Sequence, residues 1–113
     1  MSKYRAQKMV VDGITFASKR EAEYYKKLKA LENAGNILCL TLQPRFILQP
    51  AFTDRAGGKH RKIEYAADFS YFEKKGRQGA LIVVDVKGFR TPIYKLKKKL
   101  LLYKHQDIVF EEV

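Results

Sequence analysis

The hydrophobic and polar positions follow first the period of a β-hairpin and then the period of a helix. Residues 9–16 place an Asp-Gly dipeptide between two apolar segments, a pattern typical of a two-residue hairpin turn. Ser18 and Glu21 have the spacing of a helical capping box, and Gly35 stands where a C-terminal cap is expected. The intervening stretch predicts a helix. Its apolar residues at helical spacing, expected to be buried, are Ala22, Tyr25, Leu28 and Leu31.

The remainder of the chain predicts further strands and one more helix. Thr91 and Pro92 supply an N-cap and a proline for the first helical turn, which predicts a helix that ends near Lys104. One run, residues 80–87, is almost wholly apolar and β-branched, as in strands buried on both faces of a sheet. The other strands are expected at 37–42, 45–49, 62–72 and 107–111, with a turn or flexible loop at 54–59 and a polar hairpin loop at 73–79.

This order of elements predicts an α/β or α+β fold with a mixed sheet. The chain has 113 residues, of which 46% are hydrophobic, so we expect residues 1–113 to form a single packed domain. No apolar run approaches the roughly 20 residues of a membrane span, and no apolar signal segment follows the basic N-terminus. A cytoplasmic protein without a membrane partner is therefore expected.

Charge favours a nucleic-acid partner. Lys and Arg number 23 against 12 Asp and Glu, which gives a formal net charge of +11. Such an excess on a small domain is typical of a protein that binds a polyanion, although a basic ribosomal or membrane-surface protein has the same composition. Cys39 is the sole cysteine and stands in an apolar run, so we expect a small buried side chain and no zinc site.

Two acidic residues interrupt segments that are otherwise apolar. Asp85 lies in the buried-strand segment, where an isolated carboxylate is costly unless it is paired or binds a metal. Side chains two positions apart in a strand share a face, so Asp85 and Lys87 are expected to project together, and Val84 and Val86 to the other side. A plain same-face ion pair between Asp85 and Lys87 is the alternative.

Asp68 repeats the pattern on the preceding strand. A hairpin loop joins that strand to the one that carries Asp85, so both carboxylates are expected at one edge of the sheet. Two convergent carboxylates form an oxygen site suited to Mg²⁺ or Mn²⁺. Such an ion activates water and stabilises charge on a phosphodiester oxygen. An aspartate that marks a bulge or accepts turn hydrogen bonds is the alternative.

The combination of Asp68 with Asp85-Val86-Lys87 resembles the catalytic signature of the PD-(D/E)xK nuclease superfamily. The resemblance implies a restriction-endonuclease-like fold, with a mixed central β-sheet flanked by helices. The whole chain also resembles a small phage and prophage family of resolvase-like proteins with this fold. The matching segments, in order, are Asp12-Gly13 with Phe16, Ser18 to Glu23, Leu42 to Phe46, Tyr65 to Phe69, and Val84 to Gly88.

The resemblance implies a role for each site residue. Asp68 and Asp85 would bind the metal, and Lys87 would act on the attacking water or the phosphate. A helical Glu often completes the site, and we assign it to Glu21, because Glu21 shares the buried face whereas Glu23 falls on the solvent side. Capping of Ser18 is the alternative role of Glu21.

Basic residues are expected to contact phosphates. Leu96, Leu100 and Tyr103 form an apolar stripe on the second helix, with lysines over the remaining surface, which also fits a solvated amphipathic helix. Gln43 is expected to orient a carboxylate or touch DNA, or else to be a satisfied strand amide, and His60 and His105 are expected at the surface. The expected nucleic-acid contacts are Gln43, Arg55, Lys59, Arg61, Lys62, Arg90, Lys95, Lys97, Lys98 and Lys99.

Together these features predict a Mg²⁺-dependent (or Mn²⁺-dependent) endodeoxyribonuclease without a small-molecule cofactor. Within that class we expect a structure-specific enzyme for branched DNA, such as a Holliday junction resolvase of phage origin. Symmetric cleavage of a junction would require a homodimer. The alternatives are a non-catalytic nucleic-acid-binding module and an interaction protein of phage replication or assembly.

Overall fold

A computed structural model describes residues 7–77, 79–86 and 90–113 of the chain. The expectations for Lys87 and Gly88 therefore lie outside the described residues. Within the described ranges, neither helix combines the length and the apolar composition that crossing a membrane requires.

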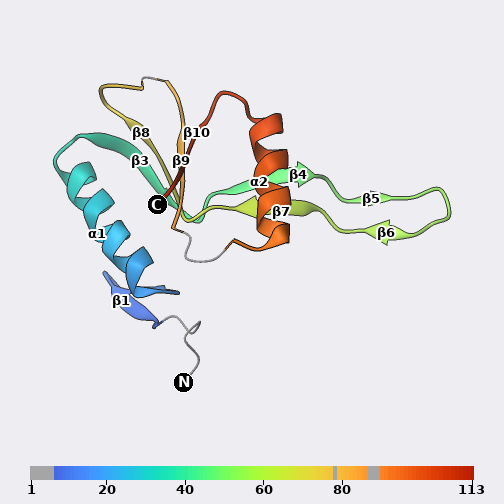
Figure 1. Ribbon diagram of the computed structural model, residues 1–113, viewed down its shortest axis with the longest axis horizontal. Helices are drawn as coiled ribbons and strands as arrows, with labels where there is room; N and C mark the ends of the chain where they lie inside the picture. Colours follow the sequence, from blue (N-terminus) through green and yellow to red (C-terminus); the bar gives the residue numbers. More distant parts are fainter. Residues whose placement is uncertain (1–6, 78, 87–89) are drawn as a thin grey trace.

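A mixed four-stranded sheet forms the centre of the fold, in the strand order β10-β9-β8-β3 (Figure 1). Strand β9 (Ile82–Asp85) runs parallel to β10 (Val109–Glu112) and antiparallel to β8 (Phe69–Glu73). Strand β8 in turn pairs antiparallel with β3 (Ile37–Leu42). The fold is therefore mixed α/β with a central mixed sheet and two helices, as the order of elements predicted.

The N-terminal hairpin and helix form as the sequence predicts. Strands β1 (Met9–Val11) and β2 (Ile14–Phe16) pair antiparallel, with Asp12 at φ +53° and Gly13 at φ +75° in the turn between them.

Helix α1 (Lys19–Asn33) follows, and the Ser18 hydroxyl caps it by accepting a hydrogen bond of 3.1 Å from the Glu21 backbone N–H. Gly35 has a φ of +80° just beyond the end of the helix, where a side chain would be strained.

The two helices cover opposite faces of β9. Ile82 and Val84 pack in a cluster with residues of α1, whereas Val83 between them packs with Leu101 of α2 (Pro92–Lys104). All strand residues of β9 are buried, which explains why this segment is apolar except at Asp85.

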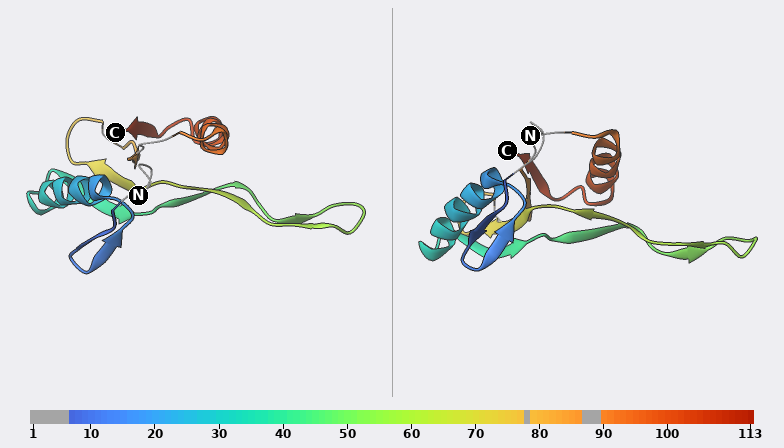
Figure 2. Two further views of the ribbon diagram at one scale, coloured as in Figure 1. Left: turned by 60° about the horizontal axis from the view of Figure 1, so that its bottom comes forward. Right: turned by 90° about the horizontal axis from the view of Figure 1, so that it is seen from below.

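A two-stranded arm projects from this body beyond α2 (Figures 1 and 2). It consists of residues 45–66. Strand β4 (Arg45–Gln49) pairs antiparallel with β7 (Ile63–Ala66) at its base, and β5 (Phe52–Thr53) pairs with β6 (Lys59–His60) nearer the tip. The turn expected at 54–59 is thus the tip of a long hairpin, and Lys59 already belongs to its return strand.

The sequence prediction of one strand over residues 62–72 is wrong. Strand β7 ends at Ala66 and β8 begins at Phe69, so Asp68 lies in a break between two strands. The facing strands break at the same level, because Pro44 has no N–H and Gln43 has a φ of +51°. The paired breaks let the arm leave the sheet in a new direction.

The tip of the arm is ordered by its own contacts. The Asp54 carboxylate accepts hydrogen bonds of 2.9 Å from the backbone N–H groups of Ala56 and Gly58. It also lies 2.7 Å from the His60 ring, which stacks on Phe52 with ring centroids 4.6 Å apart. The bond to His60, followed by the backbone bonds, lowers the pKa of Asp54.

The expectation that Cys39 is buried is wrong. Cys39 is exposed, and its φ is +57° within a stretch where the register of β3 and β8 shifts between Leu38 and Thr41. The irregularity breaks the alternation of inward and outward side chains, so an apolar run did not predict burial here.

The apolar stripe of α2 also faces away from the core. Leu96, Leu100 and Tyr103 are all exposed, and Leu101 is the buried residue of this helix. The helix therefore packs on the sheet with one narrow face and leaves a second apolar face uncovered by the described part of the chain.

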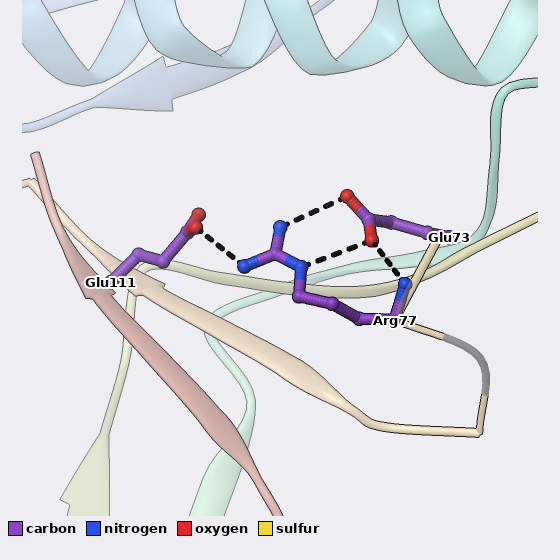
Figure 3. Close-up of polar contacts among 3 residues, drawn as sticks. All are labelled: Glu73, Arg77 and Glu111. Carbon is purple, nitrogen blue, oxygen red and sulfur yellow. Dashed lines mark hydrogen bonds and ion pairs between the residues drawn. The ribbon is translucent and has the colours of Figure 1, made fainter. Parts of the chain in front are cut away.

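An arginine links the inner strand β8 to the edge strand β10 (Figure 3). The Arg77 guanidinium donates to the Glu73 carboxylate at 2.9 and 3.0 Å, and to Glu111 of β10 at 2.8 Å. The bonds from Arg77 to Glu73 lower the pKa of Glu73, with the side-chain bond as the main cause.

Adjacent leucines of α2 give a matched test of the packing. Leu101 is 0% exposed and Leu102 is 38% exposed. We expect Leu101→Ala to lower the free energy of unfolding by about 2–5 kcal/mol, because it empties a buried site. Leu102→Ala should change it by about 0.5 kcal/mol or less. Urea denaturation of both variants measures the difference, and equal losses would contradict the packing of α2.

A pH series tests the link through Arg77. The pKa of Glu73 is lower in the folded protein than its ordinary value of 4.5, so its ion pair stabilises the fold above that value. The stabilisation is lost as pH falls through the lowered pKa. We therefore expect Arg77→Gln to reduce the free energy of unfolding at neutral pH and to equal wild type near about pH 2. A deficit that is the same at every pH would count against this assignment.

Candidate functional site

The ends of β3, β8 and β9 meet at the breaks in the strands. The backbone N–H of Gln43 donates to the Asp68 carbonyl at 2.9 Å, and the Asp68 N–H donates to the Val84 carbonyl at 3.1 Å. Asp68 is thus held on both sides by backbone hydrogen bonds, although it belongs to no strand. This fixes the position from which its carboxylate projects.

The Asp68 carboxylate joins the ends of β8 and β9. It accepts a hydrogen bond of 2.7 Å from the Val86 backbone N–H, just beyond β9. Phe69 pairs with Val84 in this ladder, so the next positions outward are Asp68 and Asp85. The two aspartates that the sequence indicated therefore occupy opposite positions at the ends of neighbouring strands.

A pocket of about 210 Å³ opens beside Asp68. Glu21 from the first turn of α1 and Gln43 from the break after β3 line it together with Asp68. Its other walls are Ile14, Thr15, Phe16, Leu42 and Phe69. The structure therefore brings together two of the expected metal ligands and the expected accessory amide, from elements far apart in the sequence.

Asp85 does not line this pocket. It is fully buried, and the Tyr65 hydroxyl donates a hydrogen bond to its carboxylate. Tyr65 packs in the same cluster as Leu101, so the Asp85 side chain lies on the α2 side of the sheet. Val84 and Val86 pack on the α1 side, as the alternation along the strand predicted. Lys87 lies outside the described residues.

The donor set of the pocket suits a hard cation. Carboxylate oxygens of Glu21 and Asp68 and the amide oxygen of Gln43 are ligands that Mg²⁺ and Mn²⁺ prefer. Mg²⁺ is often held by one or two carboxylates and keeps several waters, so two carboxylates suffice. In the described part of the chain, no group of three or more His, Cys, Asp or Glu residues is arranged around one metal position.

Glu112 organises a second polar cluster that sequence reasoning missed. It pairs with Asp85 in the β9–β10 register, and its carboxylate accepts from the Tyr94 hydroxyl and from Arg90 at 3.2 Å and lies 3.4 Å from Lys98. The Tyr94 bond is the main cause that lowers the pKa of Glu112. Burial, followed by the same bond, raises the pKa of Tyr94. The sequence signal was the Glu111-Glu112 pair at the end of the last strand.

This cluster already engages two of the expected nucleic-acid contacts. Arg90 and Lys98 already have a carboxylate partner in Glu112, and the Lys98 ammonium also lies 4.9 Å from the centroid of the Phe110 ring. Their charge is therefore partly neutralised within the protein. The other expected cations divide between two elements. Those on α2 are Lys95, Lys97 and Lys99, and those on the arm are Arg55, Lys59, Arg61 and Lys62.

Substitutions at Asp68 separate its structural role from any chemical role. Asp68→Ala leaves the Val86 N–H without its acceptor, so we expect a loss of about 1–3 kcal/mol in the free energy of unfolding. Asp68→Asn retains an acceptor oxygen and should lose less than half as much. Chemical denaturation measures both values, and an Asn variant as unstable as the Ala variant would refute the role of this hydrogen bond.

Comparisons with known proteins give a family but no activity. No curated protein and no solved structure matches the chain. One family model matches residues 1–112, and its description is "Protein of unknown function (DUF1064)". Because this match extends over nearly the whole sequence, the chain belongs to the DUF1064 family.

Proposed function

We propose that this protein is a metal-dependent endonuclease of the PD-(D/E)xK type that hydrolyses phosphodiester bonds in DNA. One observation carries the proposal: Glu21 and Asp68 line one pocket, beside the strand end that bears Asp85 and leads to Lys87. The net charge of +11 supports a polyanionic substrate.

In this proposal Glu21 and Asp68 hold the cation, Mg²⁺ or Mn²⁺, with Gln43 as an accessory oxygen donor. When bound, the cation supplies Lewis-acid stabilisation of the phosphoryl oxygens and lowers the pKa of a water molecule. The hydrogen bond from the Val86 N–H holds the orientation of Asp68 beside the pocket. Lys87 is assigned to the attacking water or to the charge that develops on the phosphate.

Asp85 requires a change of conformation to join the same site. Its carboxylate accepts from Tyr65 on the α2 side, so rotation away from that hydroxyl is needed before it meets the pocket of Glu21 and Asp68. Because Asp85 projects to the α2 side of the sheet whereas Glu21 lies on the α1 side, the backbone at the end of β9 must also move before both carboxylates share one cation.

For the substrate we propose branched DNA, such as a Holliday junction. The support is that the cations extend from α2 over the projecting arm, a surface large enough to contact more than one stretch of phosphate backbone. Cleavage of both strands of a junction further requires a homodimer. A phage origin, with action in the host cytoplasm, follows from the family resemblance of the sequence.

The second candidate function is a nucleic-acid-binding module without catalysis. Burial of Asp85 against Tyr65 favours it, as does the lack of a three-carboxylate cluster among the described residues. Both candidates predict binding to DNA, and they differ only in cleavage.

Cleavage of a four-way junction, a flap and a linear duplex, each with Mg²⁺, Mn²⁺ or a chelator, distinguishes the two. We expect cutting that requires the cation and prefers the branched substrates. Asp68→Asn, Asp85→Asn and Glu21→Gln should each lower the rate on the order of 100-fold or more while DNA binding persists.

The control for this experiment is Glu23→Gln, which removes an exposed carboxylate two residues from Glu21 on the same helix. It should cut like wild type. Cutting by Asp85→Asn at the wild-type rate would show that the assignment of Asp85 is wrong. DNA binding without cation-dependent cutting of any substrate would favour the non-catalytic module.

A further inference from the structure

A groove lies between the arm and α2, on the side of the molecule away from the pocket of Glu21 and Asp68. Its volume is about 1010 Å³. Apolar side chains of both elements line it: Ile63 of β7, with 38% of its surface exposed, and Leu96 and Leu100 of α2, with 58% and 42% exposed. Exposed apolar side chains that adjoin one another in a hollow indicate a binding surface.

Cations line both sides of this groove. Arg45, Arg61 and Lys62 come from the arm, and Lys97 comes from α2. Among the described lining residues Glu64 is the one carboxylate, and it lies 3.4 Å from both Arg45 and Lys62. Within the described ranges Arg61 and Lys97 form no ion pair, so they retain their full charge for a ligand.

An apolar floor between cationic walls matches the chemistry of a single nucleic-acid strand. Its phosphates are anionic, and its unpaired bases present apolar faces that pack on apolar side chains. A duplex stacks those faces inside the helix and offers the groove only phosphates. A second copy of this chain would bring the same cations against Arg61 and Lys97, at a net charge of +11 for each copy.

The inner end of the groove reaches Tyr65, the hydrogen-bond partner of Asp85 at the end of β9. Tyr65 and Tyr94 line the groove, and the Tyr65 hydroxyl binds the Asp85 carboxylate. The arm itself begins at the strand breaks that hold Gln43 and Asp68. A strand that lies along the groove therefore runs toward the ends of β8 and β9.

We propose that the groove between the arm and α2 binds a single-stranded segment of DNA and directs it to the strand ends that bear Asp68 and Asp85. This inference deepens the proposed nuclease function, because it assigns the substrate an unpaired segment next to the cleaved bond. The binding step itself needs no metal and no catalysis.

Fluorescence anisotropy with a labelled oligothymidylate tests this directly, in the presence of a chelator so that no cleavage occurs. Thymidylate forms no duplex, so it probes single-strand binding alone. We expect Leu96→Asn to weaken binding of this probe about tenfold, because it removes an apolar side chain on which an unpaired base would pack. Arg61→Ala combined with Lys97→Ala should also make the binding less sensitive to salt. The slope of log binding constant against log salt concentration should fall in magnitude by about 1.4, or about 0.7 for each lost phosphate contact.

Two control variants match these changes. Leu102→Asn introduces the same polar side chain on an exposed part of α2 outside the groove, and it should bind the probe like wild type. Lys74→Ala combined with Lys75→Ala removes two charges from the loop after β8, at the other end of β8 from the arm, and should change the slope by less than half as much. Equal effects of test and control variants would overturn the proposal.

Two further measurements keep this inference distinct from the nuclease proposal. Groove-dependent probe binding without cleavage of any substrate would support the groove and reject the nuclease. If wild type cleaves DNA but substitutions at Leu96 and Arg61 leave the affinity for the probe unchanged, the groove proposal is rejected and the nuclease proposal stands. Sedimentation velocity completes the test: a wild-type dimer that Leu96→Asn converts to a monomer, with probe binding unchanged, would identify the groove as a self-association surface and overturn the proposal.

Discussion

The hydrogen bond from the Val86 N–H to the Asp68 carboxylate, at 2.7 Å, is the contact on which the candidate site depends. At this level the strands on both sides of β8 stop pairing in the regular way, and the arm turns out of the sheet. A side-chain acceptor here replaces a backbone acceptor that the break removes, and an unmade bond at a buried strand end would cost about 1–3 kcal/mol. The same contact sets the direction in which Asp68 faces the pocket of Glu21.

Much of the fold could be predicted from local sequence signals, because each signal restricts the backbone conformation of a few residues. The Asp-Gly turn, the Ser18 cap and the Thr91-Pro92 start each specify a backbone conformation, and each element lies where its signal predicts. The alternation along β9 likewise predicted which side chains share a face. The helical stripe predicted that Glu21 turns inward and Glu23 outward, and Glu21 lines the pocket while Glu23 is exposed.

The predictions that failed concern features set by contacts between residues far apart in the sequence. Residues 62–72 alternate like one strand, and only the backbone pairing of Asp68 with Val84 and Gln43 shows why that strand divides. Burial of Cys39 failed because a shift in register turned its side chain outward. Spacing along the chain also placed Asp68 and Asp85 on adjacent strand ends, and alternation gave the face of Asp85. Neither identified Tyr65 of β7, 20 residues away, as the partner of its carboxylate, because that contact forms only when β7 and β9 come together in the fold.

The two helices give the two faces of the sheet different characters. The α1 face closes over an apolar core and leaves a small acidic pocket, whereas the α2 face leaves an apolar stripe and cations open toward the arm. The proposed nuclease would use both: carboxylates to hold a cation, and a separate cationic surface to hold the phosphate backbone. Tyr65 lines the groove and its hydroxyl donates to Asp85, so the groove adjoins the end of β9.

Calorimetric titration of the wild-type protein with Mn²⁺ tests the central claim most directly, because it requires neither a substrate nor turnover. The account predicts binding at one site that Asp68→Asn and Glu21→Gln each weaken strongly and that Glu23→Gln leaves unchanged. Wild-type protein that binds no Mn²⁺, or that binds it with the same affinity after Asp68→Asn, would contradict the account.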